Sequence, residues 1–406
     1  MTVLDRFVKI PQKLNNRRKF SNLQKNIHKD TFRDHLSIIE SSKLQFLETD
    51  LANSSGVIVQ RGIALRDSVL CYFSNKYQSE NELRFLIHVP PANVSPAGFS
   101  IFSNLLDTLT YMGVACERLE WNVPISDYLT SFAPTVLLSS DSAEYLSQLD
   151  WGAINNYKLD HQFRVGLTAS IEAYGNKPLN NRLRWAIKNK IDFYYSFRTP
   201  EYVQTRREYK QFFEEGFNIY HIEFGANPLL YFPVSHERRD IPFVFLGSSN
   251  SDKHSRYVEW FGQIFKQHSG FINGPGWHSM NSAIPMNLNR FIYARARVGI
   301  NLHLDEQVIW ANELNERTYT LAACGVPQLI DSPKLLGARF SEGAMFQANS
   351  AKEYLDLFHH ILSSPDEAQA KATIALEEVY AKHTTFHRAE IFINQLSDNK
   401  IKKLFE

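Results

Sequence analysis

The sequence predicts an α/β protein with two doubly wound, Rossmann-like domains facing each other across a cleft, and a helical N-terminal extension. The chain has 406 residues, whereas a single core rarely grows beyond about 250–300 residues. From residue 84 onward, short apolar runs alternate with segments of helical periodicity, which is typical of parallel strands connected by helices. The alternation stops at the charged segment 235–240 and then restarts, so we expect two domains.

Composition excludes several classes of protein. Lys and Arg number 44 against 43 Asp and Glu, for a net charge of +1, so a generally basic nucleic-acid binder is not expected. No apolar run approaches the roughly 20 residues of a membrane span, and the first residues lack the core of a signal peptide. The three cysteines lie far apart, without the spacing of a zinc site or disulfide framework. We expect a cytoplasmic protein.

Residues 1–80 are expected to form the helical extension, and their first part is strongly basic. Residues 1–29 contain eight Lys or Arg and one acid, Asp5. Such a segment can rest on an anionic surface, which would place the protein peripherally on the inner membrane face. The alternative is a solvated arm or a helix packed on its own domain, which Pro11 favours because it is expected to interrupt a long amphipathic helix.

The N-terminal Rossmann-like domain is expected to cover residues 81–235. Its apolar runs predict strands, and the periodic segments between them predict helices. The expected strands are 84–90, 114–121, 134–140, 164–170 and 191–197, and the expected helices are 98–111, 144–157, 179–190 and 200–216.

The C-terminal domain is expected to cover residues 236–406 and to repeat this alternation. Its expected strands are 241–248, 271–273, 298–304 and 326–332, and its expected helices are 255–268, 287–297, 312–325, 352–364, 366–383 and 386–396.

The loop after strand 241–248 is a candidate diphosphate site, because ligands of open parallel sheets lie beyond the carboxyl ends of the strands. Gly247 permits close backbone approach, Ser248 offers a hydroxyl, and Lys253 and Arg256 bring positive charge. The alternative is a tight, solvated turn. The loop has neither a P-loop nor a G-x-G-x-x-G pattern.

The segment 298–331 is the second candidate. The expected helix 312–325 would place Asn312 and Glu313 at its N-terminus, where they can meet phosphate and ribose, and Arg317 one turn inside, where it can fork onto phosphate oxygens. The alternative for Arg317 is an ion pair with Glu313 along the helix. His303 at the preceding strand end could face the diphosphate or be a buried histidine. The Asn273–Trp277 turn could bound a nucleobase pocket, or be a plain turn.

Residues of about 215–395 resemble the C-terminal half of GT-B glycosyltransferases, in particular the group similar to the spore-maturation protein CgeB. Five pieces carry the resemblance in order, namely EFGANPLLYFP, RRDIPFVFLGS, YARARVGINLH, NERTYTLAACGVPQLID and KHTTFHRAEIF. Many retaining relatives carry a Glu-x7-Glu pair, and in that register this chain has Asn312 and Thr320.

The resemblance implies sugar transfer from a nucleotide-sugar donor held by the C-terminal domain through Gly247, Ser248, Lys253, Arg256, His303, Asn312, Glu313, Arg317 and Thr320. It also implies that no metal or cofactor is needed, because basic side chains and a helix N-terminus neutralise the leaving diphosphate.

The N-terminal domain should supply the acceptor site, and an inverting transfer needs a base near the attacking hydroxyl. Three residues follow or end expected strands and are candidates: Glu172 first, then Asp141 and His88. Each has a structural alternative as a turn or cap residue, and Asp141 could be the N-cap of the helix that follows it.

We therefore expect a metal-independent glycosyltransferase that acts on a glycan or lipid-linked acceptor, in bacterial surface glycan synthesis. Two alternatives stay open. One is a nucleotide-sugar epimerase of the same fold, and the other is a GT-B-like binding or assembly protein that has lost its chemistry.

Overall fold

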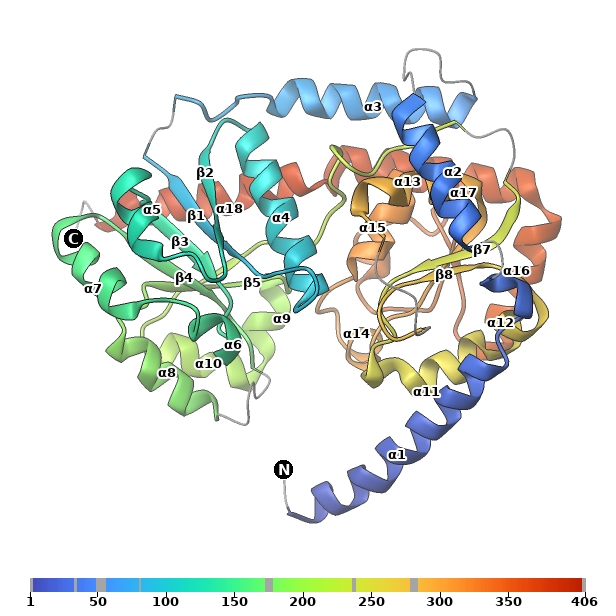
Figure 1. Ribbon diagram of the computed structural model, residues 1–406, viewed down its shortest axis with the longest axis horizontal. Helices are drawn as coiled ribbons and strands as arrows, with labels where there is room; N and C mark the ends of the chain where they lie inside the picture. The colour runs from blue at the N-terminus through green and yellow to red at the C-terminus, as the bar shows by residue number, and fades with distance from the viewer. Residues whose placement is uncertain are drawn as a thin grey trace. The chain divides into compact units, whose positions relative to one another are not determined.

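The computed structural model describes residues 3–32, 35–48, 56–79, 82–171, 178–235, 239–277 and 284–403 (Figure 1). The chain forms two compact units. Unit 1 contains Met1–Ser68 and Pro228–His383, and unit 2 contains Val69–Asn227 and Thr384–Glu406. This division differs from the expected one in two places. The segment Met1–Ser68, expected as a separate extension, belongs to the same unit as the second half of the chain. The segment Thr384–Glu406, expected in the C-terminal domain, belongs to the unit formed by the first half.

The N-terminal extension is helical, as expected, and contains α1 (Val3–Lys25), α2 (His35–Glu48) and α3 (Val57–Phe73). The expected interruption at Pro11 is wrong, because α1 continues through that residue. A proline removes one backbone hydrogen bond from a helix, which bends it without always ending it. The C-terminal part of α1 is fixed by burial of Phe20 and Leu23 in the core of unit 1.

Unit 2 is built on a six-stranded parallel sheet in the order β2-β1-β3-β4-β5-β6. The strand order reverses between β1 and β3, which makes the sheet doubly wound. Helix α4 packs on β1 and β2, and α18 packs on α4 and β6. The strands are β1 (Arg84–Val89), β2 (Ala115–Glu120), β3 (Val136–Ser139), β4 (Arg164–Thr168), β5 (Phe193–Ser196) and β6 (Ile219–His221). The helices are α4 (Pro96–Tyr111), α5 (Ile125–Ser131), α6 (Ala143–Leu146), α7 (Trp151–Asp160), α8 (Leu179–Lys188), α9 (Pro200–Thr205), α10 (Arg207–Glu214) and α18 (Thr385–Lys403).

Unit 1 is built on a five-stranded parallel sheet in the order β11-β10-β9-β7-β8, again doubly wound, with its reversal between β7 and β9. Its strands are β7 (Ile241–Leu246), β8 (Phe271–Asn273), β9 (Ala296–Asn301), β10 (Gln328–Ile330) and β11 (Phe346–Gln347). Its remaining helices are α11 (His254–Arg256), α12 (Gly262–Gln267), α13 (Asn289–Arg295), α14 (Asp305–Ile309), α15 (Glu316–Ala323), α16 (Ala351–Ser363) and α17 (Pro365–Lys382). A 3-10 turn (Ser251–Lys253) precedes α11, and a π-helical turn (Tyr257–Phe261) joins α11 to α12.

Three expected helices differ in their bounds. The segment 144–157 forms two helices, because Asp150 accepts hydrogen bonds from the amides of Gly152 and Ala153 and so starts α7. The segment 200–216 divides into α9 and α10. The helix expected to start at residue 312 starts at Glu316, with Asn315 as its N-cap.

Two parallel, doubly wound sheets and a helical N-terminal segment confirm the predicted fold class. In the part of the chain that the structure describes, no helix is both long and apolar enough to cross a membrane.

Candidate functional site

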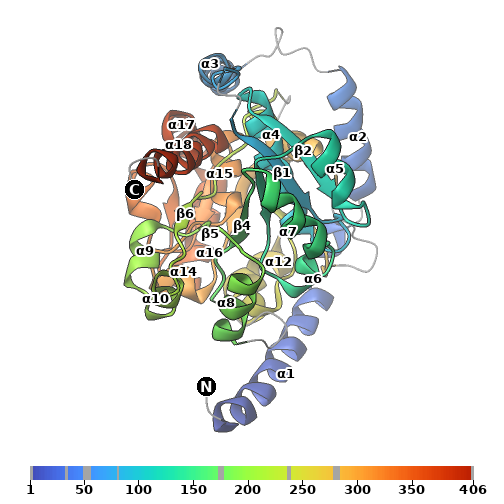
Figure 2. The same cartoon turned by 90° about the vertical axis from the view of Figure 1, so that its left-hand side faces the viewer.

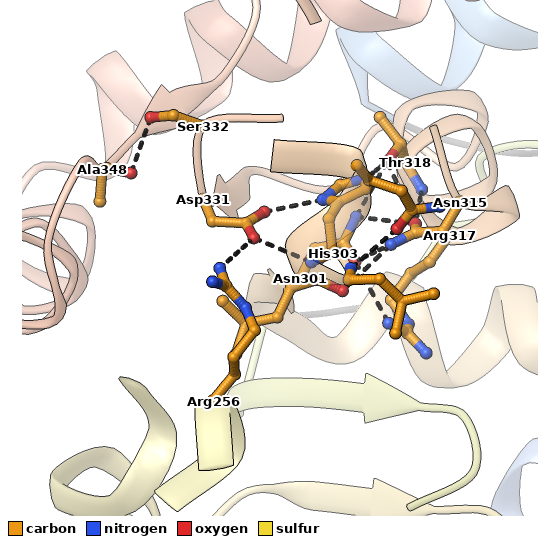
Figure 3. Close-up of polar contacts among 12 residues, drawn as sticks. Arg256, Asn301, His303, Asn315, Arg317, Thr318, Asp331, Ser332 and Ala348 are labelled. Atoms are coloured by element: carbon orange, nitrogen blue, oxygen red, sulfur yellow. Dashed lines mark hydrogen bonds and ion pairs between the residues drawn. The ribbon is translucent and has the colours of Figure 1, made fainter. Parts of the chain in front are cut away.

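The candidate site lies at the carboxyl edge of the unit 1 sheet, at the reversal between β7 and β9, where open parallel sheets bind their ligands. Gly247 directly follows β7, and Leu302 and His303 directly follow β9. Asp331 follows β10 at the same edge, and α15 begins nearby, because its N-cap Asn315 donates a hydrogen bond to the Leu302 carbonyl at 3.2 Å (Figure 3).

Asp331 binds both His303 and Arg256 (Figure 3). Its carboxylate accepts from the His303 amide at 2.9 Å and from His303 Nδ1 at 2.7 Å, and it pairs with Arg256 Nη2 at 2.7 Å. Burial lowers the pKa of His303, although Asp331 opposes the shift. Burial would raise the pKa of Asp331, but His303 and Arg256 hold it below its usual value. The pair is thus a neutral imidazole bound to an ionised carboxylate.

Asn301, the last residue of β9, ties the strand to α15. Its side-chain amide donates to Asn315 Oδ1 at 3.1 Å, to Thr318 Oγ1 at 3.0 Å and to Gln328 Oε1 at 3.0 Å. Its Oδ1 accepts from Asn315 Nδ2 at 2.9 Å and from Arg317 Nη1 at 3.2 Å. This network fixes the N-terminus of α15 at the carboxyl edge of the sheet (Figure 3).

Arg317 reaches from α15 to the end of β7. Its Nε donates to the Leu246 carbonyl at 2.9 Å, and its guanidinium lies 4.1 Å from the centre of the Phe245 ring. A Cβ on Gly247 would lie 2.0 Å from Arg317 Nη2, so the glycine leaves room for this side chain. The Arg317 charge therefore lies at the candidate phosphate loop, bonded to neutral oxygens.

Lys253 is buried beside Arg317, with 8% of its surface exposed. Its Nζ donates to the Leu302 carbonyl at 2.8 Å and so bridges the loops that follow β7 and β9. Burial, together with the positive charges of Arg317 and Arg256, lowers the pKa of Lys253 to about 7, although Asp331 and Glu313 act in the opposite direction. The ammonium group is close to losing its proton at neutral pH.

Three further predicted donor residues, Arg256, His303 and Ser248, lie at the carboxyl edge of the sheet. Arg256 is paired with two carboxylates, Asp331 and Asp305, the latter at 3.0 Å. His303 is buried against Asp331. Ser248 follows Gly247 in the loop, and its carbonyl accepts from the Tyr257 hydroxyl at 3.4 Å.

Asn312 and Glu313 lie in the loop before α15, so their expected place at its N-terminus is wrong. Asn312 is 1% exposed; its Oδ1 accepts from the Glu313 amide at 2.9 Å, and its Nδ2 is buried without a hydrogen-bond partner. Glu313 Oε1 accepts from Gln307 Nε2 at 3.0 Å. Thr320 lies inside α15, one turn beyond Arg317, and its hydroxyl donates to the Arg317 carbonyl at 3.4 Å.

The Asn273–Trp277 turn braces the loop after β7. The Gly247 amide donates to the Asn273 carbonyl at 2.8 Å, and Trp277 Nε1 donates to the Gly247 carbonyl at 2.8 Å. Gly274 has φ +141°, and a Cβ there would lie 2.3 Å from the Gly247 carbonyl oxygen. The Trp277 ring is 2% exposed and belongs to the core, so it is not available to stack on a base.

Two of the candidate bases lie at the carboxyl edge of the unit 2 sheet. His88 is the last residue but one of β1, is 1% exposed and shares a 2.9 Å hydrogen bond between its Nδ1 and Ser139 Oγ. Burial lowers its pKa to about 4. Glu172 lies outside the described residues.

Asp141 lies after β3 in a buried polar cluster. It accepts from the hydroxyls of Thr168 and Ser170, both at 2.8 Å, and forms an ion pair with Arg182. Burial raises its pKa to about 6, against the opposing charge of Arg182. Its expected role as an N-cap is wrong, because Ser142 occupies that position of α6.

Four residues of the site were not predicted: Asn301, Asn315, Thr318 and Asp331. Asp331 is the last residue but one of the expected strand 326–332, so its position near a strand end was the available signal. The amides and the hydroxyl carry no signal in sequence, because their role depends on side chains brought together from β9 and α15. Within the described ranges, no group of three or more His, Cys, Asp or Glu residues could hold a metal ion.

Comparison with known proteins finds relatives of the fold as a whole and a family match for the second half of the chain. Residues 235–394 match the family model described as glycosyl transferase-like. No curated protein sequence matches the chain. The structure resembles that of T4 phage BGT, a β-glucosyltransferase, in complex with UDP and Mn²⁺, with a TM-score of 0.52 and 11% identity over 77% of this chain and 99% of that one.

The same T4 phage enzyme in complex with its UDP-glucose substrate gives a TM-score of 0.50 and 12% identity, and covers 77% of this chain and 98% of the other. The resemblance indicated by the sequence is confirmed at the level of fold and of the matched segment. The chain has the fold of the GT-B glycosyltransferases, and its residues 235–394 match the glycosyl transferase-like family.

Proposed function

We propose that this protein is a glycosyltransferase that moves a sugar from a nucleotide-sugar donor to a glycan or lipid-linked acceptor. The observation that carries the proposal is the placement of Lys253 and Arg317 at the carboxyl edge of the unit 1 sheet. Their hydrogen bonds go to the Leu302 and Leu246 carbonyls and to the Asn301 side chain. Neither cation forms an ion pair among the described contacts, so both charges are available to an anion.

A leaving diphosphate is the anion that such a site would stabilise. Charge develops on it as the bond to the sugar breaks, and fixed positive groups in a poorly hydrated site lower the energy of that state. The N-terminus of α15 adds its dipole from the same edge. A diphosphate next to Lys253 would favour the charged ammonium and restore a pKa that burial has lowered.

A UDP-linked sugar is the first donor to test. Its support is the fold shared with T4 phage BGT, which is described in complex with UDP-glucose. The matched segment, residues 235–394, contains Lys253 and Arg317.

We propose that the transfer needs neither cofactor nor metal, because Lys253 and Arg317 would take over the neutralisation of the diphosphate. Activity that persists in excess EDTA, without stimulation by added Mn²⁺ or Mg²⁺, would support this. Loss of activity in EDTA with recovery on adding one of these ions would contradict it.

On the acceptor side, the candidate bases are Glu172, Asp141 and His88. His88 is neutral at pH 7 because its pKa is near 4, and Asp141 is committed to its contact with Arg182. We also propose a role in bacterial surface glycan synthesis. Peripheral attachment to the inner membrane face through residues 1–29 is supported by the excess of basic residues in that segment.

The test is a screen of UDP-, GDP-, ADP- and CMP-linked sugars by thermal shift, followed by incubation of the stabilising donor with and without acceptors. Sugar transfer that requires an acceptor supports the proposal. Conversion of the donor sugar in the absence of acceptor would indicate an epimerase, and binding without transfer or hydrolysis would indicate a protein that only binds.

A further inference from the structure

A groove of about 1160 Å³ lies between α1 and the loop Ser249–His254, outside the cluster that contains Lys253 and Arg317. We propose that this groove binds an acidic glycan chain. The proposal goes beyond the donor site, and it rests on the proposed function only in that such a glycan would be the acceptor.

The groove is preformed, because α1 is fixed against the loop. The Phe20 ring stacks on the His254 ring at 3.8 Å between centres, with 7° between their planes. Gln24 Nε2 donates to the carbonyls of Gly276 and Trp277, at 2.7 and 3.0 Å. The rest of α1 extends away from unit 1, as both ribbon views show (Figures 1 and 2). The groove is larger than the roughly 300–1,000 Å³ of a typical small-molecule pocket, which favours an extended chain.

The charge of the lining selects an acidic ligand. Arg17, Arg18 and Lys25 line the groove, and the lining contains one acid, Asp252. Burial lowers the pKa of His254, and the positive charge of Arg17, which lines the same groove, acts in the same direction. Guanidinium groups bind carboxylate and sulfate or phosphate oxygens in a forked geometry.

The uncharged lining favours a glycan over other anionic chains. Six side chains with amide or hydroxyl groups line the groove, four on α1 and two, Ser249 and Ser251, on the loop, and such groups suit sugar hydroxyls. Single-stranded nucleic acid prefers free aromatic faces on which bases stack, whereas the two aromatic rings of this lining, Phe20 and His254, stack on each other. A membrane surface prefers an exposed apolar helix face, whereas most of the α1 side chains that line this groove are polar or basic.

The test measures binding of a short heparin fragment, as a soluble acidic glycan, and of an uncharged dextran fragment of similar length, by calorimetry with the full chain. The variant R17E/R18E reverses two charges in the groove. The matched control K19E/K29E makes the same change in net charge at exposed positions of the same segment that do not line it.

We expect heparin to bind the wild type and the control alike, dextran not to bind, and R17E/R18E to lose at least about tenfold in affinity, which corresponds to the loss of one or two charge-assisted contacts. Equal heparin affinity of R17E/R18E and wild type, or an equal loss in the control, would overturn the proposal. So would binding of oligothymidylate or of phosphatidylglycerol vesicles with the same affinity and the same sensitivity to R17E/R18E.

UDP binding separates this inference from the proposed function. R17E/R18E should keep the UDP affinity of the wild type, and Arg317→Ala should keep its heparin affinity. Failure of UDP to bind any of these proteins contradicts the donor site alone, whereas unchanged heparin binding by R17E/R18E contradicts the groove alone.

Discussion

The Arg317 guanidinium lies directly against the backbone of Gly247: a Cβ on Gly247 would lie 2.0 Å from Arg317 Nη2. The loop after β7 therefore contains glycine because a cationic side chain from α15 fills the space where a larger residue would extend. This close approach brings the Arg317 guanidinium to the end of β7, where a phosphate is expected. Its hydrogen bond to the Leu246 carbonyl links α15 to this loop.

Gly247→Ala tests that relationship. The added methyl group must displace Nη2, the far end of the Arg317 side chain, so we expect a cost below the roughly 1–3 kcal/mol of overpacking a rigid core. We expect a lower melting temperature and weaker UDP binding, measured by thermal shift and calorimetry. Gly337→Ala, where an added Cβ would meet no atom within 4 Å, is the control and should change neither the melting temperature nor the UDP affinity strongly. Unchanged UDP affinity in Gly247→Ala would mean that the position of Arg317 is irrelevant to the ligand.

Lys253 predicts a dependence of stability on pH. Its pKa is lowered to about 7 in the folded protein from a usual value of 10.5, so between these values the unfolded chain binds more protons than the folded one. Through this group the free energy of unfolding must rise with pH between about 7 and 10.5, and below pH 7, where both states carry the proton, it no longer depends on pH. Lys253→Met keeps most of the length of the side chain and removes the titration. We expect a flatter slope of unfolding free energy against pH in the variant, measured by denaturant titration.

The same group predicts proton uptake on ligand binding. A diphosphate beside Lys253 raises its pKa, so binding of UDP near pH 8 should take up protons. Calorimetry in buffers of different ionisation enthalpy measures this number directly. A value that is positive in the wild type and close to zero in Lys253→Met is expected. The same uptake in both proteins would assign it to another group.

Asp331→Asn removes the carboxylate that binds His303 and Arg256. Loss of one partner from a buried ion pair typically costs about 3–5 kcal/mol. Arg256 keeps a second, exposed partner in Asp305, so we expect a loss of stability at neutral pH towards the lower end of this range. Since the pKa of Asp331 lies below its usual value, its stabilising contribution in the wild type is present above that value and disappears as the pH falls through the folded pKa. The difference between variant and wild type should therefore shrink in strong acid.

The two doubly wound parallel sheets were predictable because apolar runs and helical periodicity report burial directly. Short elements such as β11 and α5 were not predicted, since a few residues carry little periodic signal. The start of α15 at Glu316 was missed because its cap, Asn315, accepts a local hydrogen bond while binding Asn301 of β9. The sequence also predicted that Lys253 and Arg317, from two different elements, contact the same donor diphosphate. It could not predict that Arg256 would be held by Asp331, because that pair joins positions 75 residues apart.

Binding of UDP to wild type and to Arg317→Ala, measured side by side by calorimetry with Arg184→Ala as a surface control, tests the central claim most directly. The account predicts that the wild type and Arg184→Ala bind UDP alike, and that Arg317→Ala remains folded and loses at least about tenfold in affinity, the equivalent of about 1.4 kcal/mol. A folded Arg317→Ala that binds UDP as tightly as the wild type would contradict the assignment of this cluster to the donor diphosphate.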